Sequence, residues 1–334
     1  MRAFLEKHRK ILIVLSFPYV YLLMILILPT GLSGTGPGGL TSVDEAIRIE
    51  GYEQSEGIHT VYVLSYNPLT PFQSWLLSAD DRMSVRPMNA FEKELSWREQ
   101  YEQGQLTKRV SYTSALINAY LLAAESSDRI EMEYRYAGLS VYYAPSRLGE
   151  LEIGDTIIAI DGVDHADYEH DEFLELIDLA DVTFTVERQD EEPFEVSYAH
   201  EEGDLPFLFY PNYRIERAVP SYDLPGEDSV YGGPSGGLMQ TISIYVSLLN
   251  INISENVLAG TGTIEADGTI GRIGGLKQKI YTAMDADVDI FFLPEAHREE
   301  FDDYDFEDLP FETVFIAHRD DIKEVIGERY ETST

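Results

Sequence analysis

Residues 11–28 form an uninterrupted run without a charged side chain, and this run constrains the fold more than any other segment. A helix rises about 1.5 Å per residue, so a run of this length is close to the minimum that crosses the hydrocarbon core of a bilayer. Four basic residues lie within positions 1–10, whereas the next basic residue is Arg48. Because basic residues favour the cytoplasmic side, the sequence predicts a single-pass cell-membrane helix over 11–29, a cytoplasmic N-terminus and extracellular C-terminal domains.

A cleaved signal peptide is the alternative interpretation of this N-terminus. Its cleavage site would have to lie within residues 29–36, where small residues occur without an Ala-x-Ala pattern. The apolar run is also long for a signal peptide. The sequence therefore favours a retained anchor.

The charge balance limits the partners of this chain. Its 334 residues include 60 acidic and 24 basic side chains, which gives a net charge of −36. Nucleic-acid binding and electrostatic docking on anionic lipid both need clusters of Lys and Arg, so neither is expected. The acidity is typical of a solvated outer surface, with adaptation to salt as the alternative. The sequence has no cysteine, which excludes disulfides, thiolate metal ligands and cysteine nucleophiles.

The region 30–137 shows no pattern that indicates chemistry. Residues 30–42 are rich in Gly, Ser, Thr and Pro, and they are predicted to be a linker that leaves the membrane. Residues 44–66 are expected to contain strand, most clearly at 61–65, and residues 114–124 have the apolar spacing of a helix. We expect this membrane-proximal α/β region to support the domains that follow it.

Residues 138–200 have the pattern of short strands separated by turns. Strands are expected at 138–143, 156–160, 182–188 and 194–198, and a helix is expected at 168–179. Residues 154–162 read Gly-Asp-x-Ile-x-x-Ile-Asp-Gly. On this motif the segment resembles a bacterial PDZ domain, and the resemblance implies that it binds extended peptides by strand addition at the edge 138–143. A small β-domain without a ligand is the alternative.

Residues 201–334 have the pattern of a mixed α/β domain. Strands are expected at 257–264, 289–294 and 312–317, helices at 276–286 and 320–328, and an Asp-Gly hairpin turn at 265–268. The predicted fold class of the whole chain is therefore α+β. Its predicted parts are a tail at 1–10, a membrane helix at 11–29, a linker and membrane-proximal region at 30–137, a PDZ-like domain at 138–200 and an α/β domain at 201–334.

Two glycine-rich segments of the last domain carry the candidate catalytic residues. Residues 231–240 place Ser235 behind a Gly-Gly-Pro turn and before an apolar helix, and residues 271–280 place Lys277 and Lys279 on a helix after a glycine-rich turn. Serine is a poor nucleophile until a base removes its proton, and lysine serves as that base when burial lowers its pKa. Periodicity does not choose between the lysines, which lie about 200° apart on a helix. Taken singly, Ser235 is typical of a helix N-cap and each lysine is typical of a solvated surface.

These segments, with the stretch between them, resemble the proteolytic domain of Lon proteases. That family has Pro-Ser-Ala-Gly at its nucleophile, then a Thr-Gly strand, a hairpin and Gly-Gly-Leu-Lys-x-Lys. The matching positions are 234–237, 261–262 and 274–279, with Gly236 where alanine is usual. The resemblance implies that Ser235 is the nucleophile, that Lys279 is its base, and that Thr261 positions the lysine amine.

The start of the helix after Ser235 is the expected oxyanion site, because free N–H groups collect at a helix N-terminus. The backbone at Gly233 and Gly236 is expected to contribute to it. No metal site is predicted, since the histidines form no His-Glu-x-x-His motif. His165 and His170, with the aspartates beside them, are typical of a solvated loop.

The order of anchor, PDZ-like domain and Lon-like domain resembles the membrane-anchored, PDZ-containing Lon-like serine proteases of Gram-positive bacteria (YlbL type). This resemblance implies an ATP-independent serine endopeptidase that cleaves exported peptides or unfolded or membrane-proximal proteins outside the cytoplasmic membrane. The sequence has no Gly-x-x-x-x-Gly-Lys-Ser/Thr loop, so neither a nucleotide nor another cofactor is expected. A homo-oligomer is left open. The alternative is a peptide-binding PDZ scaffold with an inactive protease domain.

Overall fold

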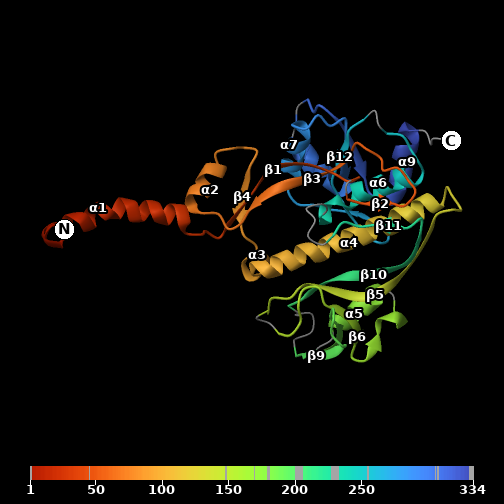
Figure 1. The fold of residues 1–334 in the computed structure, drawn as a ribbon, viewed down its shortest axis with the longest axis horizontal. Coiled ribbons are helices and arrows are strands. Elements are labelled where there is room, and N and C mark those ends of the chain that lie inside the picture. The colour runs from red at the N-terminus through yellow and green to blue at the C-terminus, as the bar shows by residue number, and fades with distance from the viewer. Residues whose placement is uncertain are drawn as a thin grey trace.

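The computed structural model describes residues 2–44, 46–146, 149–168, 170–178, 181–199, 206–226, 233–253, 256–304, 306 and 308–330. It shows a mixed α/β protein with two six-stranded sheets and two small two-stranded sheets. Helix α1 (Arg2–Ile27) projects away from both large sheets, and the long helix α4 (Trp97–Ala124) lies between them (Figure 1).

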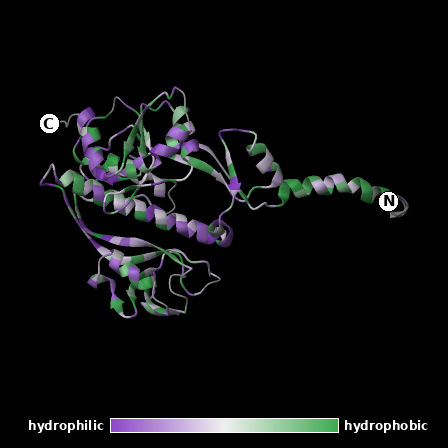
Figure 2. Ribbon diagram, turned by 180° about the vertical axis from the view of Figure 1, so that it is seen from behind, coloured by the Kyte–Doolittle hydropathy of each residue, from purple (hydrophilic) through white to green (hydrophobic). Residues whose placement is uncertain are grey.

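Helix α1 corresponds to the predicted membrane helix. Its segment His8–Ile27 is long and apolar enough to cross a membrane, and none of it is buried against the rest of the protein. Figure 2 shows hydrophobic residues along most of this isolated helix. These properties suit a membrane span and also a signal sequence.

The first large sheet contains strands from both ends of the sequence. In spatial order its strands are β16 (Glu312–Ile316), β15 (Ile290–Pro294), β12 (Leu258–Gly260), β3 (Ile58–Tyr66), β1 (Leu32–Ser42) and β4 (Ser84–Pro87). Strand β3 pairs in parallel with β12 and antiparallel with β1. The strands predicted at 61–65, 289–294 and 312–317 are confirmed.

The prediction of a linker at 30–42 is wrong, because these residues form β1 inside the sheet. The glycines of β1 reflect close packing. A Cβ on Gly38 would lie 2.2 Å from the carbonyl oxygen of Tyr62, and one on Gly34 would lie 2.9 Å from Leu77 Cδ1. Packed atoms do not approach so closely, so the small residues that suggested a linker are those that let β1 fit between its neighbours.

The strand predicted at 257–264 is interrupted. Strand β12 ends at Gly260, and the next two residues make no regular strand pairing. The chain continues as β13 (Thr263–Ile264), which pairs antiparallel with β14 (Ile270–Gly271) to form the predicted hairpin. Residues 261–262 are thereby free to turn toward a neighbouring element.

Helices cover both faces of the first sheet. Apart from α1, α4, the β13–β14 hairpin and the elements of the second large sheet, the α-helices and minor strands of the described chain are α2 (Pro71–Leu77), α3 (Ala90–Glu94), α6 (Gly237–Leu248), α7 (Leu276–Met284), α8 (Arg298–Asp303), α9 (Arg319–Arg329), β2 (Arg48–Ile49) and β11 (Tyr222–Asp223). Helices α4, α6 and α9 bury their apolar residues against Ile58, Leu258 and Phe292 on one face. Helix α7 packs against Val61 and Ala259 on the other. The predicted helices at 114–124, 276–286 and 320–328 are confirmed, the first as part of α4.

The second large sheet corresponds to the segment with the PDZ-like motif. Its strands are β10 (Leu208–Val219), β5 (Glu131–Tyr143), β6 (Thr156–Ile160), β8 (Val182–Glu187) and β9 (Phe194–Tyr198), with β7 (Val163–Asp164) paired to β6. The strands predicted at 156–160, 182–188 and 194–198 are confirmed. The predicted helix is shorter than expected, with α5 (His170–Glu175) followed by a 3-10 turn, and Leu179 lies outside the described residues.

Strand β5 is not an edge of this sheet. Strand β10 pairs with it along its length, with Phe209 opposite Val141, and β6 pairs on its other side, with Leu139 opposite Ile157. The prediction that 138–143 is open for strand addition is therefore wrong. An open edge invites unwanted pairing, and here β10, which lies beyond residue 200, covers it.

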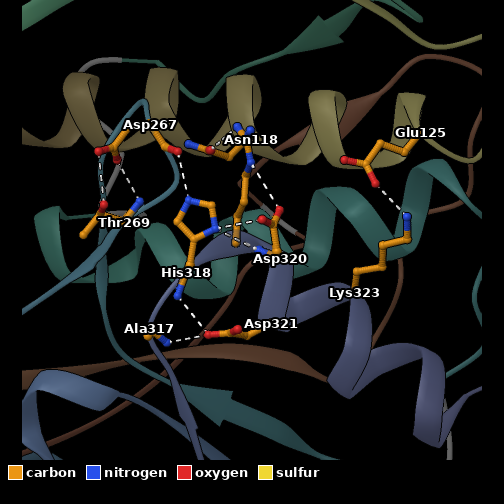
Figure 3. A network of polar contacts seen from close by, with 10 residues as sticks. Asn118, Glu125, Asp267, Thr269, Ala317, His318, Asp320, Asp321 and Lys323 are labelled. Carbon is orange, nitrogen blue, oxygen red and sulfur yellow. Dashed lines mark hydrogen bonds and ion pairs between the residues drawn. The ribbon is translucent and has the colours of Figure 1, made fainter.

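A polar network fastens α4 to the C-terminal part of the chain, as Figure 3 shows for Asn118, Glu125 and Lys323. Asn118 is fully buried; its amide donates to the carbonyl oxygen of Glu265 at 2.7 Å and accepts from Arg319 Nη1 at 2.9 Å. Lys323 donates to Glu125 at 2.6 Å on the exposed side of the network. Helix α4 is thus part of the same body as α9 and the β13–β14 hairpin.

Replacing Asn118 with leucine should lower the free energy of unfolding by about 2 kcal/mol, because Arg319 Nη1 loses this acceptor and the carbonyl oxygen of Glu265 keeps only the N–H of Gly268 as a donor. The matched control is Glu125→Ala, which breaks an exposed ion pair with Lys323 and should cost much less. Urea unfolding of the detergent-solubilised protein measures both. Equal losses would contradict the role of Asn118 in holding α4.

Candidate active site

Ser235 lies in the short 3-10 turn Pro234–Gly236, directly before α6. Its carbonyl oxygen accepts two hydrogen bonds, from the N–H of Gly262 at 2.8 Å and from the hydroxyl of Thr261 at 3.0 Å. Both donors lie in the interruption after β12. The end of that strand therefore fixes the backbone of Ser235.

The start of α6 approaches its neighbours closely. A Cβ on Gly237 would lie 2.8 Å from Ile264 Cγ2, so this position needs glycine. A Cβ on Gly236 would lie 3.1 Å from both Thr60 Cγ2 and Gln240 Nε2, which is a tight contact with movable side chains. Glycine at 236, where the resembling family usually has alanine, removes that contact.

Lys279 reaches Ser235 from the opposite face of the sheet. Its side chain is only 3% exposed, and its Nζ lies 2.8 Å from Ser235 Oγ and 2.9 Å from Thr261 Oγ1. Burial disfavours the ammonium form and lowers the pKa of Lys279 to about 7. A large fraction of the amine is therefore neutral near neutral pH, and only a neutral amine accepts a proton.

The hydrogen bonds around Thr261 give this amine a direction. The Thr261 hydroxyl donates its proton to the carbonyl oxygen of Ser235, so its oxygen accepts from Lys279. When the amine is neutral, one N–H is engaged with Thr261 and the lone pair is left for the Ser235 hydroxyl. Thr261 therefore holds the serine backbone and orients the amine.

The structure distinguishes Lys277 from Lys279 by their contacts with Ser235, and it distinguishes an N-cap role of Ser235 from a role as nucleophile. Lys277 Nζ lies 6.0 Å from the centroid of the Tyr281 ring, and its side chain is partly exposed. The N-cap of α6 is Gly236, and no side chain caps this helix. Ser235 is thus no N-cap, and Lys279 rather than Lys277 contacts it.

Backbone N–H groups near Ser235 are available to a developing negative charge. The N–H of Gly236 is already engaged with the carbonyl oxygen of Gly233 at 3.0 Å. The N–H groups of Gly233 and Ser235 have no acceptor among the residues that the structure describes. They lie at the positive end of the α6 dipole, which favours an anion there.

A cleft of about 970 Å³ opens beside Ser235 and Lys279. Strands β1 and β3 line it, together with Arg86 of β4 and the turns that precede α6 and α7. Strand β3 pairs with β12 only as far as Thr60, so among the described residues its edge over 61–66 has no partner strand on that side. The sequence does not predict that β1 lines the cleft, because the glycine-rich residues 30–42 have the composition of a linker.

Within the described ranges, no group of three or more His, Cys, Asp or Glu side chains could hold a metal ion. His165 Nδ1 instead contacts the carbonyl oxygen of Ile158 at 2.9 Å.

Comparison with known proteins bears on the C-terminal part of the chain, which contains this cluster. Residues 199–329 match the Lon protease (S16) C-terminal proteolytic domain. The Lon protease of Chlamydia pneumoniae is 27% identical over 125 residues, Lon protease 1 of Syntrophobacter fumaroxidans 31% over 115 residues, and the Lon protease of Borrelia duttonii 34% over 96 residues. The matched region contains Ser235, Thr261 and Lys279, and it implies a serine peptidase.

These similarities are confined to part of each protein. They cover 36%, 34% and 28% of this chain, and 14%, 13% and 11% of the respective relatives. Strands β1 and β3 and helix α4, which complete the body around the cleft, lie outside the match at 199–329. The comparisons therefore bear on Ser235, Thr261 and Lys279 more than on strands β1 and β3, which line the cleft.

Replacing Lys279 with methionine should stabilise the protein near neutral pH. The pKa of Lys279 is about 7 in the folded protein, against about 10.4 in an unfolded chain. Between these values the unfolded chain binds more protons, so stability rises with pH, and burying the amine costs on the order of 4 kcal/mol at about pH 7. Methionine has similar length and no charge, so it removes this cost.

The measurement is the difference in thermal unfolding midpoint between Lys279→Met and wild type at about pH 7 and about pH 9.5. The advantage of the variant should shrink at the higher pH, because the folded amine is then neutral and the pH lies within about one unit of the unfolded pKa of about 10.4, so most of the cost of deprotonating the amine is gone. Lys277→Met, at the partly exposed lysine, is the matched control and should show little change with pH. An advantage of Lys279→Met that does not depend on pH would contradict the lowered pKa.

Proposed function

We propose that this protein is an ATP-independent serine endopeptidase in which Ser235 and Lys279 form the catalytic dyad. The contact of 2.8 Å between Lys279 Nζ and Ser235 Oγ, made by a buried amine, is the observation that supports this best. The match of residues 199–329 to a Lon proteolytic domain supports the same reaction class. The sequence has no P-loop motif, which supports independence from ATP.

In the proposed first step, neutral Lys279 takes the proton of Ser235 as the serine oxygen attacks the scissile carbonyl. The tetrahedral intermediate then collapses, the C–N bond breaks, and the lysine ammonium gives its proton to the leaving amine. A water molecule attacks the acyl-serine ester with Lys279 again as base. The proton then returns to the serine oxygen, so the enzyme ends as it began.

The N–H groups of Gly233 and Ser235 are the proposed oxyanion donors. Both lie at the uncapped N-terminus of the α6 segment, on the same turn as the nucleophile. Donors fixed before the reaction stabilise the oxyanion without reorganisation, which is worth about 3–4 kcal/mol for a single donor in a serine protease.

The cleft favours an extended substrate. The edge of β3 over 61–66 offers backbone N–H and C=O groups along the cleft, and an extended peptide would pair with them as an added strand. Because the chain would have to be extended already, we propose that substrates are exported peptides or unfolded or membrane-proximal protein segments.

The second sheet is proposed to be a PDZ-like domain. Its motif at 154–162 supports this, but β10 occupies the edge of β5. Peptide binding by strand addition would therefore use β9 or β10, the outer strands of this sheet. We further propose that α1 is a retained anchor with the sheets outside the cytoplasmic membrane, supported by the basic residues of its first turns, which precede the uncharged run 11–28.

Ser235→Ala should abolish hydrolysis of an unstructured protein such as casein, because the attacking oxygen is lost. Lys279→Ala should be equally inactive, because no base remains. Lys277→Ala is the matched control on the same helix and should keep most of its activity, since that lysine does not contact Ser235. Fluorescence-based casein hydrolysis by the purified, detergent-solubilised protein measures all three.

The wild-type kcat/KM should rise with pH and level off above the pKa of Lys279 at about 7, because the neutral amine is the active form. Undiminished cleavage by Ser235→Ala would rule out the serine mechanism. Activity lost in Lys277→Ala but retained in Lys279→Ala would show that Lys277, and not Lys279, is the base. A bound but uncleaved substrate in all variants, wild type included, would favour the scaffold interpretation.

Protease added to intact protoplasts should degrade the C-terminal domains, and the protein should sediment with membranes. The reason is that α1 contains the candidate span, and the basic residues at its start precede the uncharged run 11–28. A cytoplasmic marker protein serves as the control for intact protoplasts. Protection of the C-terminal domains would reverse the topology, and a shortened protein in the medium beginning between residues 30 and 40 would favour a cleaved signal peptide.

A further inference from the structure

Helix α2 exposes a small apolar face. Phe72, Trp75 and Leu76 are 41%, 69% and 53% exposed, and they occupy positions i, i+3 and i+4 of the helix. The rings of Phe72 and Trp75 lie 6.0 Å apart. Leu77 points the other way, toward Gly34 of β1. These three outward side chains are named the α2 face, and an exposed apolar cluster of this kind indicates an interaction surface.

Helix α2 lies beside the end of α1 (Figure 1). Thr30, three residues after α1, donates both its N–H and its hydroxyl to the carbonyl oxygen of Leu69 at 2.7 Å. The N–H of Leu69 in turn donates to the carbonyl oxygen of Leu32 at 2.9 Å. Leu69 is fully buried and precedes Thr70, the N-cap of α2. The start of α2 is therefore fixed at the point where the chain leaves α1.

The chain around this point is free of charge. Residues 11–43, which include most of α1 and all of β1, contain no Asp, Glu, Lys or Arg, and neither do residues 57–79, which include β3 and α2. Charged residues make up 25% of the whole chain, so a stretch of 23 residues would ordinarily hold five or six of them. Absence of charge in both stretches suits a surface that meets lipid, where a charge is costly.

We propose that the α2 face inserts into the headgroup–acyl boundary of the bilayer on the side where α1 ends, as a second membrane contact. Tryptophan and other amphipathic or apolar side chains prefer that boundary. The net charge of −36 opposes attraction to anionic lipid, so an uncharged apolar contact is the kind that this protein can make.

A second copy of this chain fits the α2 face less well. Large aromatic side chains bury roughly 150–250 Å² each. Three side chains on a helix of seven residues therefore fall short of the roughly 800 Å² per partner in a stable protein interface. Continuity with α1 favours the bilayer as the occupant.

This contact would define the substrate class of the proposed protease. It rests on the proposed membrane anchor, and it adds an orientation that α1 alone would not impose. The end of β3 leads directly to α2, and the cleft runs along β3. A second contact at α2 would fix the orientation of the cleft beside the membrane surface. Its substrates would then be peptide segments that emerge from the bilayer.

The chain supplies its own probe, because Trp75 and Trp97 are its two tryptophans. The full-length Trp97→Phe protein, reconstituted into phosphatidylcholine vesicles, reports Trp75 alone. Trp75→Phe is the matched control and reports Trp97, which is 78% exposed at the start of α4. Lipids brominated near the carbonyl end or near the methyl end of the acyl chain then quench a tryptophan according to its depth.

Trp75 emission should be blue-shifted and quenched most by bromines near the carbonyl end, because an interfacial helix lies about 5–10 Å into the boundary. Trp97 should emit as in water and stay unquenched. A Trp75 that emits as in water, or one that is blue-shifted without quenching because protein covers it, would overturn the contact while the protein still floats with the vesicles. Failure to float would overturn the anchor and the contact together. None of these readouts depends on proteolysis.

Discussion

The candidate active site of this protein depends on the removal of one amine from water. A buried ammonium is destabilised unless a counter-charge pairs with it. Within the described part of the chain, the contacts of Lys279 Nζ are the hydroxyls of Ser235 and Thr261, and neither carries a charge. The site therefore tolerates the neutral amine better than the ammonium, which turns an ordinarily protonated side chain into a base. Burial of the Lys279 amine lowers the folding stability, and the same burial is what the proposed chemistry requires of the base.

Three segments must meet to create that environment, and the first sheet brings them together. Helix α6 lies on one face and α7 on the other, so Ser235 and Lys279 meet only past the end of β12. Thr261 lies at that point, and its N–H is held by the carbonyl oxygen of Phe292 on β15 at 3.0 Å. In a longer β12 the N–H of Gly262 would be used in pairing between strands. The interruption that sequence periodicity did not anticipate leaves this N–H to donate to the carbonyl oxygen of Ser235 at 2.8 Å, beside the Thr261 hydroxyl that contacts both candidate residues.

The sequence predicted local elements well and their partners poorly. The spacing of Ser235, Thr261 and Lys279 matched a family pattern, whereas periodicity left Lys277 and Lys279 equivalent, since burial depends on what α7 packs against. Residues 30–42 were taken for a linker, because glycine in a tightly packed strand has the same composition as glycine in a flexible one. Strand 138–143 was found, but its pairing with β10 was not, because that contact joins residues about 70 positions apart. Long-range pairing leaves little trace in local composition.

The anchor and the cleft are linked more directly than the expected linker would allow. Residues 28–31 are all that separate the end of α1 from the start of β1, and β1 lines the cleft. An extended residue spans at most about 3.6 Å, so this connection reaches roughly 15 Å. Hydrogen bonds from Thr30 to the carbonyl oxygen of Leu69 restrict the movement of this connection further. With α1 in a bilayer, the cleft therefore stays near the membrane surface, and a protein segment far from that surface would not reach Ser235. In the proposed protease, the short connection would therefore select substrates by position before any side chain in the cleft contacts them.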